Sequence, residues 1–242
     1  MKFKQHYSGS SGNLYTVTAA NGQRVIIDVG LTWKKVLKAL DYDLSGIQGV
    51  FPDHAHLDHS KSTFDALESG LDVYANESTL VKHEALNHYN AHLIKGGDKI
   101  ELDDFKVLCF DVNHDVPCVG FVIQEIVTKE TMLFATDTAF LKQKFEIPFD
   151  IVAIECSYEK DWLQKRVDSG DIHEAVAKRL LMSHFEKSNC MKYLKEKVDL
   201  SRCRELHLLH LSGDNIDHER TRREFEEEFF IETIICDDRP GL

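Results

Sequence analysis

The stretch Phe51-Pro52-Asp53-His54-Ala55-His56-Leu57-Asp58-His59 decides how this sequence is interpreted. It places three imidazoles and a carboxylate within the six residues from His54 to His59, and these are ligands that suit zinc, manganese and iron. The spacing of His54 and His56 lets both point one way from an extended loop, while Asp58 and His59 begin a turn into a helix and can serve a neighbouring ion. We therefore predict a metal site, because a solvated polar loop rarely has this pattern.

Around this stretch, apolar runs rich in β-branched residues alternate with helical patterns. Asn21-Gly22, between two such runs, predicts a hairpin turn. The predicted strands are 14–18, 24–29, 47–51, 72–75, 99–102, 105–112, 119–127, 132–136, 151–156, 205–211 and 231–236. The predicted helices are 32–44, 60–68, 77–87, 172–183, 187–197 and 218–229. Many strands in meander order, interrupted by helices, predict two sheets packed together with helices outside.

Polar side chains follow the ends of several predicted strands. Asp28, His114, Asp137 and His210 each come after an apolar run, as the stretch from His54 to His59 does. Strand ends gather along one edge of a sandwich of sheets. Residues that are far apart in the sequence could therefore share one site.

The composition limits the classes of protein to consider. The 242 residues, 43% of them hydrophobic, suit one large domain with a sizeable core. The formal net charge of −12 argues against holding nucleic acid by the overall field, although it leaves room for a local basic rim. Six cysteines without a Cys-x-x-Cys pair suit reduced thiols. With no membrane-spanning run and no apolar leader at Met1–Ser10, we predict a cytoplasmic protein.

The motif His-x-His-x-Asp-His after an apolar strand resembles the signature of the metallo-β-lactamase-fold superfamily. The resemblance extends from Ser8 to Cys236 and implies an α/β (α+β) fold. This fold is a four-layer αββα sandwich of two mixed sheets, with helices on both outer faces and the metals at one edge. It implies a single metallo-β-lactamase-like domain over residues 1–242.

The resemblance also assigns the site. It implies two divalent ions, with zinc as the first expectation and manganese or iron as alternatives. His54, His56 and His114 would hold one ion, Asp58, His59 and His210 the other, and Asp137 would bridge them. Asp28 would brace the metal loop by orienting a histidine ligand. Two ions about 3.5–4 Å apart can hold a hydroxide between them as the nucleophile, so no serine or cysteine nucleophile is needed.

Three further features resemble one bacterial subgroup that includes a cell-wall-associated exonuclease and phage-encoded relatives. They are Ser8-Gly9-Ser10-Ser11-Gly12-Asn13, the pattern His-Leu-Ser-x-x-Asn at His210–Asn215, and a helix that leads into His184. Cys156-Ser157-Tyr158 and Glu186 depart from the subgroup pattern, which puts the substrate in doubt more than the metals. The subgroup implies a phosphodiester substrate in DNA or RNA, with catalytic roles for Asp58, Asp137 and His184.

Several alternatives stay open at this point. His184 could donate a proton to a leaving oxygen or could simply end a helix, and Glu155 could support the site or be a solvated strand end. The same metals could serve a carboxyl-ester, lactone or thioester hydrolase. His56 argues against an iron redox protein, because such relatives usually have glutamate at this position. The complete ligand set argues against a binding module without catalysis. A basic rim at Lys160, Lys165 and Arg166 would favour nucleic acid. No membrane or protein partner is inferred.

Overall fold

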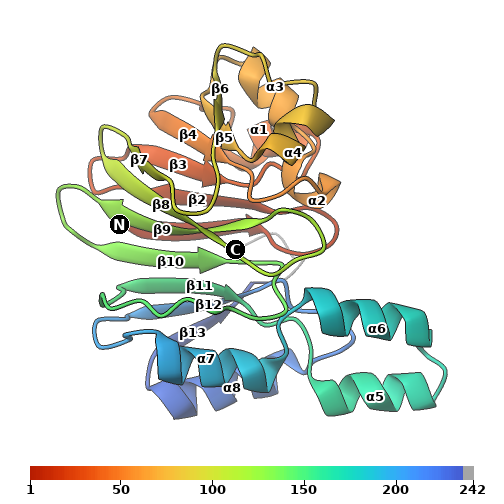
Figure 1. Cartoon of the computed structure of the whole chain (residues 1–242). Helices are drawn as coiled ribbons and strands as arrows, with labels where there is room; N and C mark the ends of the chain where they lie inside the picture. Colours follow the sequence, from red (N-terminus) through yellow and green to blue (C-terminus); the bar gives the residue numbers. More distant parts are fainter. Residues whose placement is uncertain (237–242) are drawn as a thin grey trace. The chain divides into compact units, whose positions relative to one another are not determined.

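A computed structural model describes residues 1–236, and residues 237–242 of the predicted domain lie outside the described part. The chain divides into two compact units (Figure 1). Among the described residues, unit 1 contains Met1–Asp111 and Val116–Glu130, and unit 2 contains Val112–Asp115 and residues 131–236. The single domain over 1–242 stays a prediction. None of the helices in the described part is long and apolar enough to cross a membrane.

A mixed sheet of six strands forms the centre of unit 1. In spatial order its strands are β1 (Lys2–Tyr7), β2 (Leu14–Thr18), β3 (Arg24–Ile27), β4 (Ile47–Phe51), β5 (Val73–Ala75) and β6 (Ala91–Leu93). The first three strands are antiparallel, and β3 to β6 are parallel. The predicted hairpin is confirmed, because Asn21-Gly22 joins β2 to β3. Gly22 has a φ of 88°, a left-handed conformation that costs glycine little.

Four short helices pack with this sheet in unit 1. They are α1 (Trp33–Ala39), α2 (Leu57–Ser60), α3 (Thr63–Glu68) and α4 (Glu77–Lys82). Their buried side chains, such as Val36, Leu67 and Leu80, share one core with Ile26 and Val50 of the sheet. Since each helix buries only one stripe, this shared core is what holds the helices in place.

Unit 1 also contains three antiparallel strands, β7 (Lys99–Glu101), β8 (Phe105–Asp111) and β9 (Val119–Glu125). In β8 buried and exposed side chains mostly alternate, as in a strand with one buried face. The Phe51 ring of β4 meets the Phe121 ring of β9 edge-on, with centroids 5.6 Å apart. These three strands therefore pack against the six-stranded sheet.

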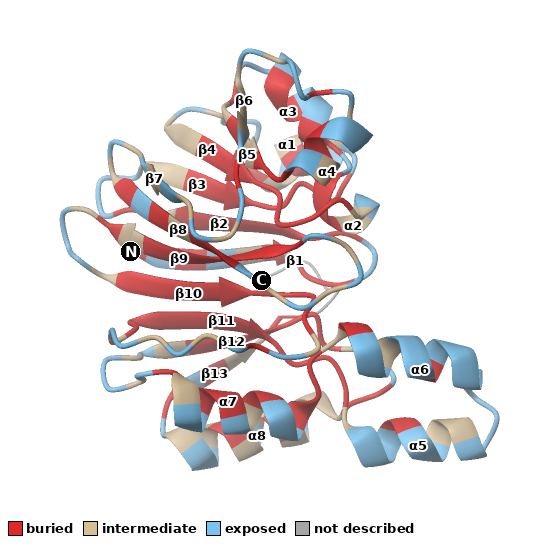
Figure 2. Cartoon of the chain, in the orientation of Figure 1, coloured by how far each residue is buried: buried red, intermediate tan, exposed pale blue. Residues whose placement is uncertain are grey.

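Unit 2 is built on four parallel strands. In spatial order they are β13 (Glu232–Ile235), β12 (Glu205–Leu209), β11 (Ile151–Glu155) and β10 (Thr131–Ala135). Every residue of β10 and β11 is buried, as parallel strands covered on both faces require (Figure 2). The helices are α5 (Lys160–Asp168), α6 (Glu174–Ser183), α7 (Lys187–Lys197) and α8 (His218–Phe229).

Unit 1 combines a mixed sheet with antiparallel strands and helices, and unit 2 combines parallel strands with helices. The predicted α/β fold class, with two mixed sheets and helices, is confirmed. Three elements were not predicted. Strand β1 buries only Phe3 and His6, strand β6 has three residues, and helix α5 buries only Leu163, so their hydrophobic patterns are weak.

Two predicted helices were too long, and the backbone conformation explains where each one ends. The helix predicted at 32–44 ends at Ala39, because Asp41 and Tyr42 have positive φ angles of 55° and 59°. The helix predicted at 77–87 ends at Lys82, before Glu84 with a φ of 53°. A left-handed residue cannot continue a right-handed helix, so the apolar pattern alone overestimated both lengths.

Candidate metal centre

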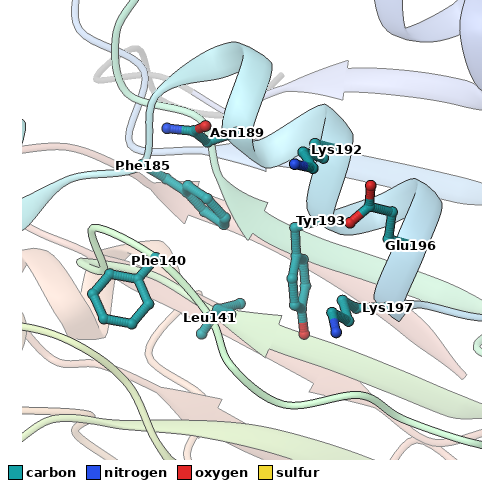
Figure 3. A pocket seen from close by; sticks show the side chains of 8 residues that line it. All are labelled: Phe140, Leu141, Phe185, Asn189, Lys192, Tyr193, Glu196 and Lys197. Atoms are coloured by element: carbon teal, nitrogen blue, oxygen red, sulfur yellow. The ribbon is translucent and has the colours of Figure 1, made fainter.

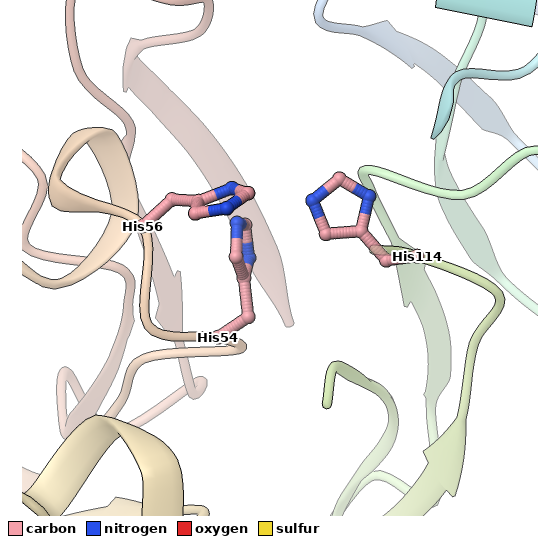
Figure 4. Close-up of side chains that lie close together, drawn as sticks. All are labelled: His54, His56 and His114. Atoms are coloured by element: carbon pink, nitrogen blue, oxygen red, sulfur yellow. The ribbon is translucent and has the colours of Figure 1, made fainter. Parts of the chain in front are cut away.

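The predicted metal motif forms a loop between β4 and α2 in unit 1. His54 and His59 are buried, whereas His56 and Asp58 are partly exposed. The rings of His54 and His56 are 4.6 Å apart and nearly perpendicular, and those of His54 and His59 are 4.2 Å apart. Figure 4 shows the rings of His54 and His56 extending from the loop. The predicted proximity of the motif's imidazoles is thus present within unit 1.

Two buried carboxylates lie behind these imidazoles. Asp53 Oδ1 lies 2.7 Å from His54 Nδ1 and 3.1 Å from His59 Nδ1, and Asp28 Oδ2 lies 2.9 Å from His59 Nδ1. A carboxylate accepts only when Nδ1 carries the proton, so Nε2 carries none and can accept from a donor or bind a cation. Asp28 therefore orients a histidine, as expected. Asp53 does the same for two histidines, although the sequence analysis gave it no role.

The two carboxylates differ in their protonation equilibria. Burial, together with the negative charge of Asp53, raises the pKa of Asp28 to about 7. Burial would also raise the pKa of Asp53, but the neighbouring His59 and His54 rings hold it below its usual range. Asp53 is therefore the carboxylate that keeps its negative charge beside the two imidazoles.

The glycine-rich turn before β2 holds the other end of the motif. The amide nitrogen of the Asn13 side chain donates to the carbonyl oxygens of Gly9 and Asp58, at 3.1 Å each, and lies 2.9 Å from His59 Nε2. The backbone N–H of Asn13 donates to the same Asp58 carbonyl at 2.7 Å. A Cβ atom on Gly30 would lie 1.6 Å from that oxygen. This turn therefore fixes the backbone of Asp58.

A second group of imidazoles and carboxylates lies in unit 2. Asp137, Glu155, His184 and His210 each offer one ligand atom, and these atoms all lie within 4.8 Å of one another. Asp137 follows β10, Glu155 ends β11 and His210 follows β12, so three adjacent parallel strands bring them together. The rings of His184 and His210 stack at 5.4 Å. The expectation that strand ends gather distant residues is met within this unit.

Glu155 is fully buried, so the alternative of a solvated strand end was wrong. Its carboxylate accepts from His184 Nδ1 at 2.6 Å and from the backbone N–H groups of Thr138 and Phe185, at 2.7 and 3.3 Å. His184 ends α6 and also lies 3.4 Å from Asp137 Oδ1. Burial lowers the pKa of His184, but Glu155 and Asp137 outweigh it and raise the pKa to about 10.

The remaining predicted ligand, His114, also belongs to unit 2. Its ring, the third side chain drawn in Figure 4, lies on the segment after β8. The ring centroid is 6.3 Å from that of His184, and Nε2 is 3.1 Å from Asp115 Oδ1.

Glu186, one of the departures from the subgroup pattern, caps α7 by accepting from the Asn189 N–H at 2.9 Å. That glutamate has a structural role.

The donor set fits divalent metal ions. Unit 1 supplies three imidazoles and the Asp58 carboxylate, and unit 2 supplies His114, Asp137 and His210, all of which are the nitrogen and oxygen donors that zinc and manganese prefer. The imidazoles of His54 and His59 are oriented by carboxylates, as is usual for metal-binding histidines. The assignment of all seven residues as ligands stays a prediction.

This fold, with imidazoles and carboxylates at its strand ends, defines a class of metal-binding α/β domains. The family described as beta-lactamase superfamily domain matches residues 23–227. The chain therefore belongs to the beta-lactamase superfamily, and the predicted superfamily is confirmed.

Relatives of known structure share the fold across the whole chain. YhfI of Bacillus subtilis, a metallo-beta-lactamase fold protein, is 16% identical in sequence to this chain. The two structures superpose with a TM-score of 0.72 over 100% of this chain and 99% of YhfI. A diphosphatase of the PhnP family is 17% identical with a TM-score of 0.67, covering 99% and 96%. Ribonuclease Z of Archaeoglobus fulgidus is 25% identical over 149 residues, 52% of this chain. The match spans only about half, 49%, of that ribonuclease.

Proposed function

We propose that the chain is a metal-dependent hydrolase that cleaves phosphodiester bonds in nucleic acid. The observation that carries the proposal is the pair of imidazole and carboxylate groups, each supported by buried carboxylates, in a chain of this superfamily. The two units together supply seven nitrogen and oxygen donors for two ions. The proposal requires the two groups to serve one centre.

The ligand assignment within this proposal follows the family resemblance. His54, His56 and His114 would hold one ion, Asp58, His59 and His210 would hold the other, and Asp137 would serve both. Bound ions would lower the pKa of a water and stabilise negative charge on a phosphoryl oxygen. Zinc is the first expectation, with manganese or iron as alternatives.

The chain's own residues would orient the metal-binding imidazoles and protonate the leaving oxygen. Asp28 and Asp53 fix the tautomers of His59 and His54, so that both rings present Nε2. Glu155 holds His184 beside Asp137, where the imidazole can donate a proton to the leaving oxygen. The geometry supports this role better than a histidine that only ends a helix, because the His184 ring faces Glu155 and Asp137.

The choice of a phosphodiester rests on relatives and on the subgroup resemblance. Ribonuclease Z and the PhnP-family diphosphatase act, by their names, on phosphate esters or anhydrides. The resemblance to the subgroup of the cell-wall-associated exonuclease and its phage-encoded relatives supports DNA or RNA. Within residues 1–236 the six cysteines form no disulfide, which suits the cytoplasmic location that belongs to the same proposal.

The test is a metal and substrate panel on the purified chain. After reconstitution with zinc, manganese or iron and dialysis, elemental analysis should give two ions per chain. The loaded protein should hydrolyse bis(p-nitrophenyl) phosphate and labelled single- or double-stranded DNA or RNA. Fast lactone, carboxyl-ester or thioester hydrolysis with inert phosphodiesters would replace this proposal with the alternative hydrolase. One ion or none in every preparation would remove the two-metal assignment.

A further inference from the structure

Unit 2 contains a cavity of about 280 Å³ beside α7. The aromatic and aliphatic part of its wall is formed by Phe140, Leu141, Phe185 and Tyr193. Lys192 and Lys197 also line the cavity, on the side of Tyr193 (Figure 3). The volume is close to the lower end of ligand pockets, roughly 300 Å³, so the cavity suits one small ring system better than a large ligand.

Two residues of the cavity wall are close in the sequence to proposed catalytic residues of the same unit. Phe140 follows Asp137 by three residues, and the Thr138 hydroxyl donates to the Phe140 carbonyl at 2.8 Å. Phe185 follows His184 directly, and its backbone N–H donates to Glu155. A group bound in the cavity would therefore lie near the residues proposed to act on the scissile bond.

Tyr193 gives an independent indication of a ligand. The residue is 6% exposed, and its hydroxyl is buried with no hydrogen-bond partner among residues 1–236. A buried hydroxyl without a partner is costly, because it has lost its water and gained nothing in return. In Figure 3 the Tyr193 side chain extends from α7 past Leu141, with the hydroxyl on the side of Lys197. A polar atom of a ligand would supply the missing partner.

The charges at the cavity are unusual for so acidic a chain. Lys195, on the same helix, pairs with Glu228 at 2.6 Å, whereas Lys192 and Lys197 form no ion pair with any described residue. Glu196 is the carboxylate in the wall. Phe140, in the same wall, is 42% exposed. The Lys142 ammonium lies 5.4 Å from the centroid of the Phe140 ring. An accessible aromatic ring beside ammonium groups is the combination that binds single-stranded nucleic acid.

We propose that this cavity is a subsite for one nucleotide of a single-stranded nucleic acid. The base stacks on Phe140 and reaches the Tyr193 hydroxyl with a polar edge atom, and a flanking phosphate binds Lys192 and Lys197. The subsite rests on the proposed function in one respect, since it names the substrate of that same site. Only a base that is free of a duplex can enter, so single strands are preferred over duplexes.

The experiment measures binding without turnover. Fluorescence anisotropy of end-labelled eight-nucleotide single strands, DNA and RNA in separate arms, is recorded at low salt with EDTA present. Lys192→Glu combined with Lys197→Glu should weaken binding at least about tenfold, and Phe140→Ala about five- to tenfold. Glu196→Gln should strengthen binding, because it removes a repelling carboxylate. The matched control is Lys34→Glu with Lys35→Glu on α1, which changes the net charge equally and should weaken binding less than twofold.

The outcomes separate this inference from the proposed function. Circular dichroism and the melting temperature verify that each variant is folded. Equal weakening by the two double variants, or an unchanged affinity in Phe140→Ala, would overturn the subsite. If the wild-type chain hydrolyses bis(p-nitrophenyl) phosphate but binds no oligonucleotide, the subsite fails and the hydrolase stands. If oligonucleotides bind through the cavity but no phosphodiester is cleaved, the subsite stands and the proposed function fails.

Discussion

The two groups of candidate ligands are organised in opposite ways. In unit 1 the donors occupy one short loop, and backbone contacts from Asn13 and Gly30 hold that loop. In unit 2 they come from separate strand ends, and a single buried carboxylate, Glu155, contacts the residues around it. A contiguous loop can be positioned locally, whereas dispersed residues depend on the register of parallel strands. We infer that local contacts fix the candidate ligands of unit 1, whereas those of unit 2 depend on strand register and on Glu155.

The largest expected effect comes from the residue proposed to serve both ions. Asp137→Ala should lower kcat/KM for bis(p-nitrophenyl) phosphate by at least about 10³-fold, because two cations lose their shared anion. Asp58→Ala and His210→Ala should also abolish most activity, while the fold persists. The measurements are steady-state kinetics, metal content and circular dichroism, with the exposed Asp161→Ala as the matched control. Near-normal turnover in Asp58→Ala or His210→Ala would contradict the two-metal assignment.

The next prediction separates the two supporting carboxylates. Asp53→Asn should weaken zinc affinity about 10- to 100-fold, because Asp53 orients both His54 and His59. Glu155→Gln should instead lower kcat with a smaller change in affinity, since it contacts His184, which is not a predicted ligand. Competition with a chromophoric zinc chelator gives the affinity, and kinetics at saturating zinc gives kcat. Equal losses of affinity would remove the proposed difference between the units.

A smaller effect is expected from the predicted basic rim on α5. Reversing the charges of Lys160, Lys165 and Arg166 should slow cleavage of nucleic acid about tenfold at low salt, and far more than hydrolysis of a small phosphodiester. Arg166 already donates to Asn215 at 2.8 Å, so the two lysines should account for most of the change. Initial rates on both substrates across a salt series are the measurement. Equal effects on the two substrates would exclude the rim.

The last expected effect concerns the stability of unit 1 against pH. Burial lowers the pKa of His6 to about 4, so the native ring stays neutral and contacts the Thr16 hydroxyl. Below the unfolded value of about 6.5 the unfolded chain takes up a proton that the native chain does not. Stability is therefore lost as the pH falls from 6.5 towards 4, by about 2 kcal/mol at pH 5. Urea unfolding of the wild type and His6→Gln at pH 7.5 and 5 should show a smaller pH dependence in the variant.

The sequence predicted the part of the site that is local. The motif from His54 to His59 could be recognised from its spacing, and Asp137 and His210 from their places after apolar runs. Asp53 and the support from Asn13 could not, because their roles depend on contacts that only folding creates. The cavity beside α7 was also beyond the sequence, since its walls come from segments 45 residues apart, at Phe140 and Phe185.

Left-handed backbone at three strand ends has a consequence for evolution. Asp28, Asp137 and His210 have φ angles of 61°, 48° and 55°, and a non-glycine residue in this region costs about 1–2 kcal/mol. Glycine or asparagine would meet the same backbone requirement at lower cost. A descendant released from selection for activity should therefore drift towards glycine or asparagine at these three positions first, while the surrounding strands stay unchanged. Retention of Asp, Asp and His in a related chain would then mark ongoing selection for chemistry, independently of the motif itself.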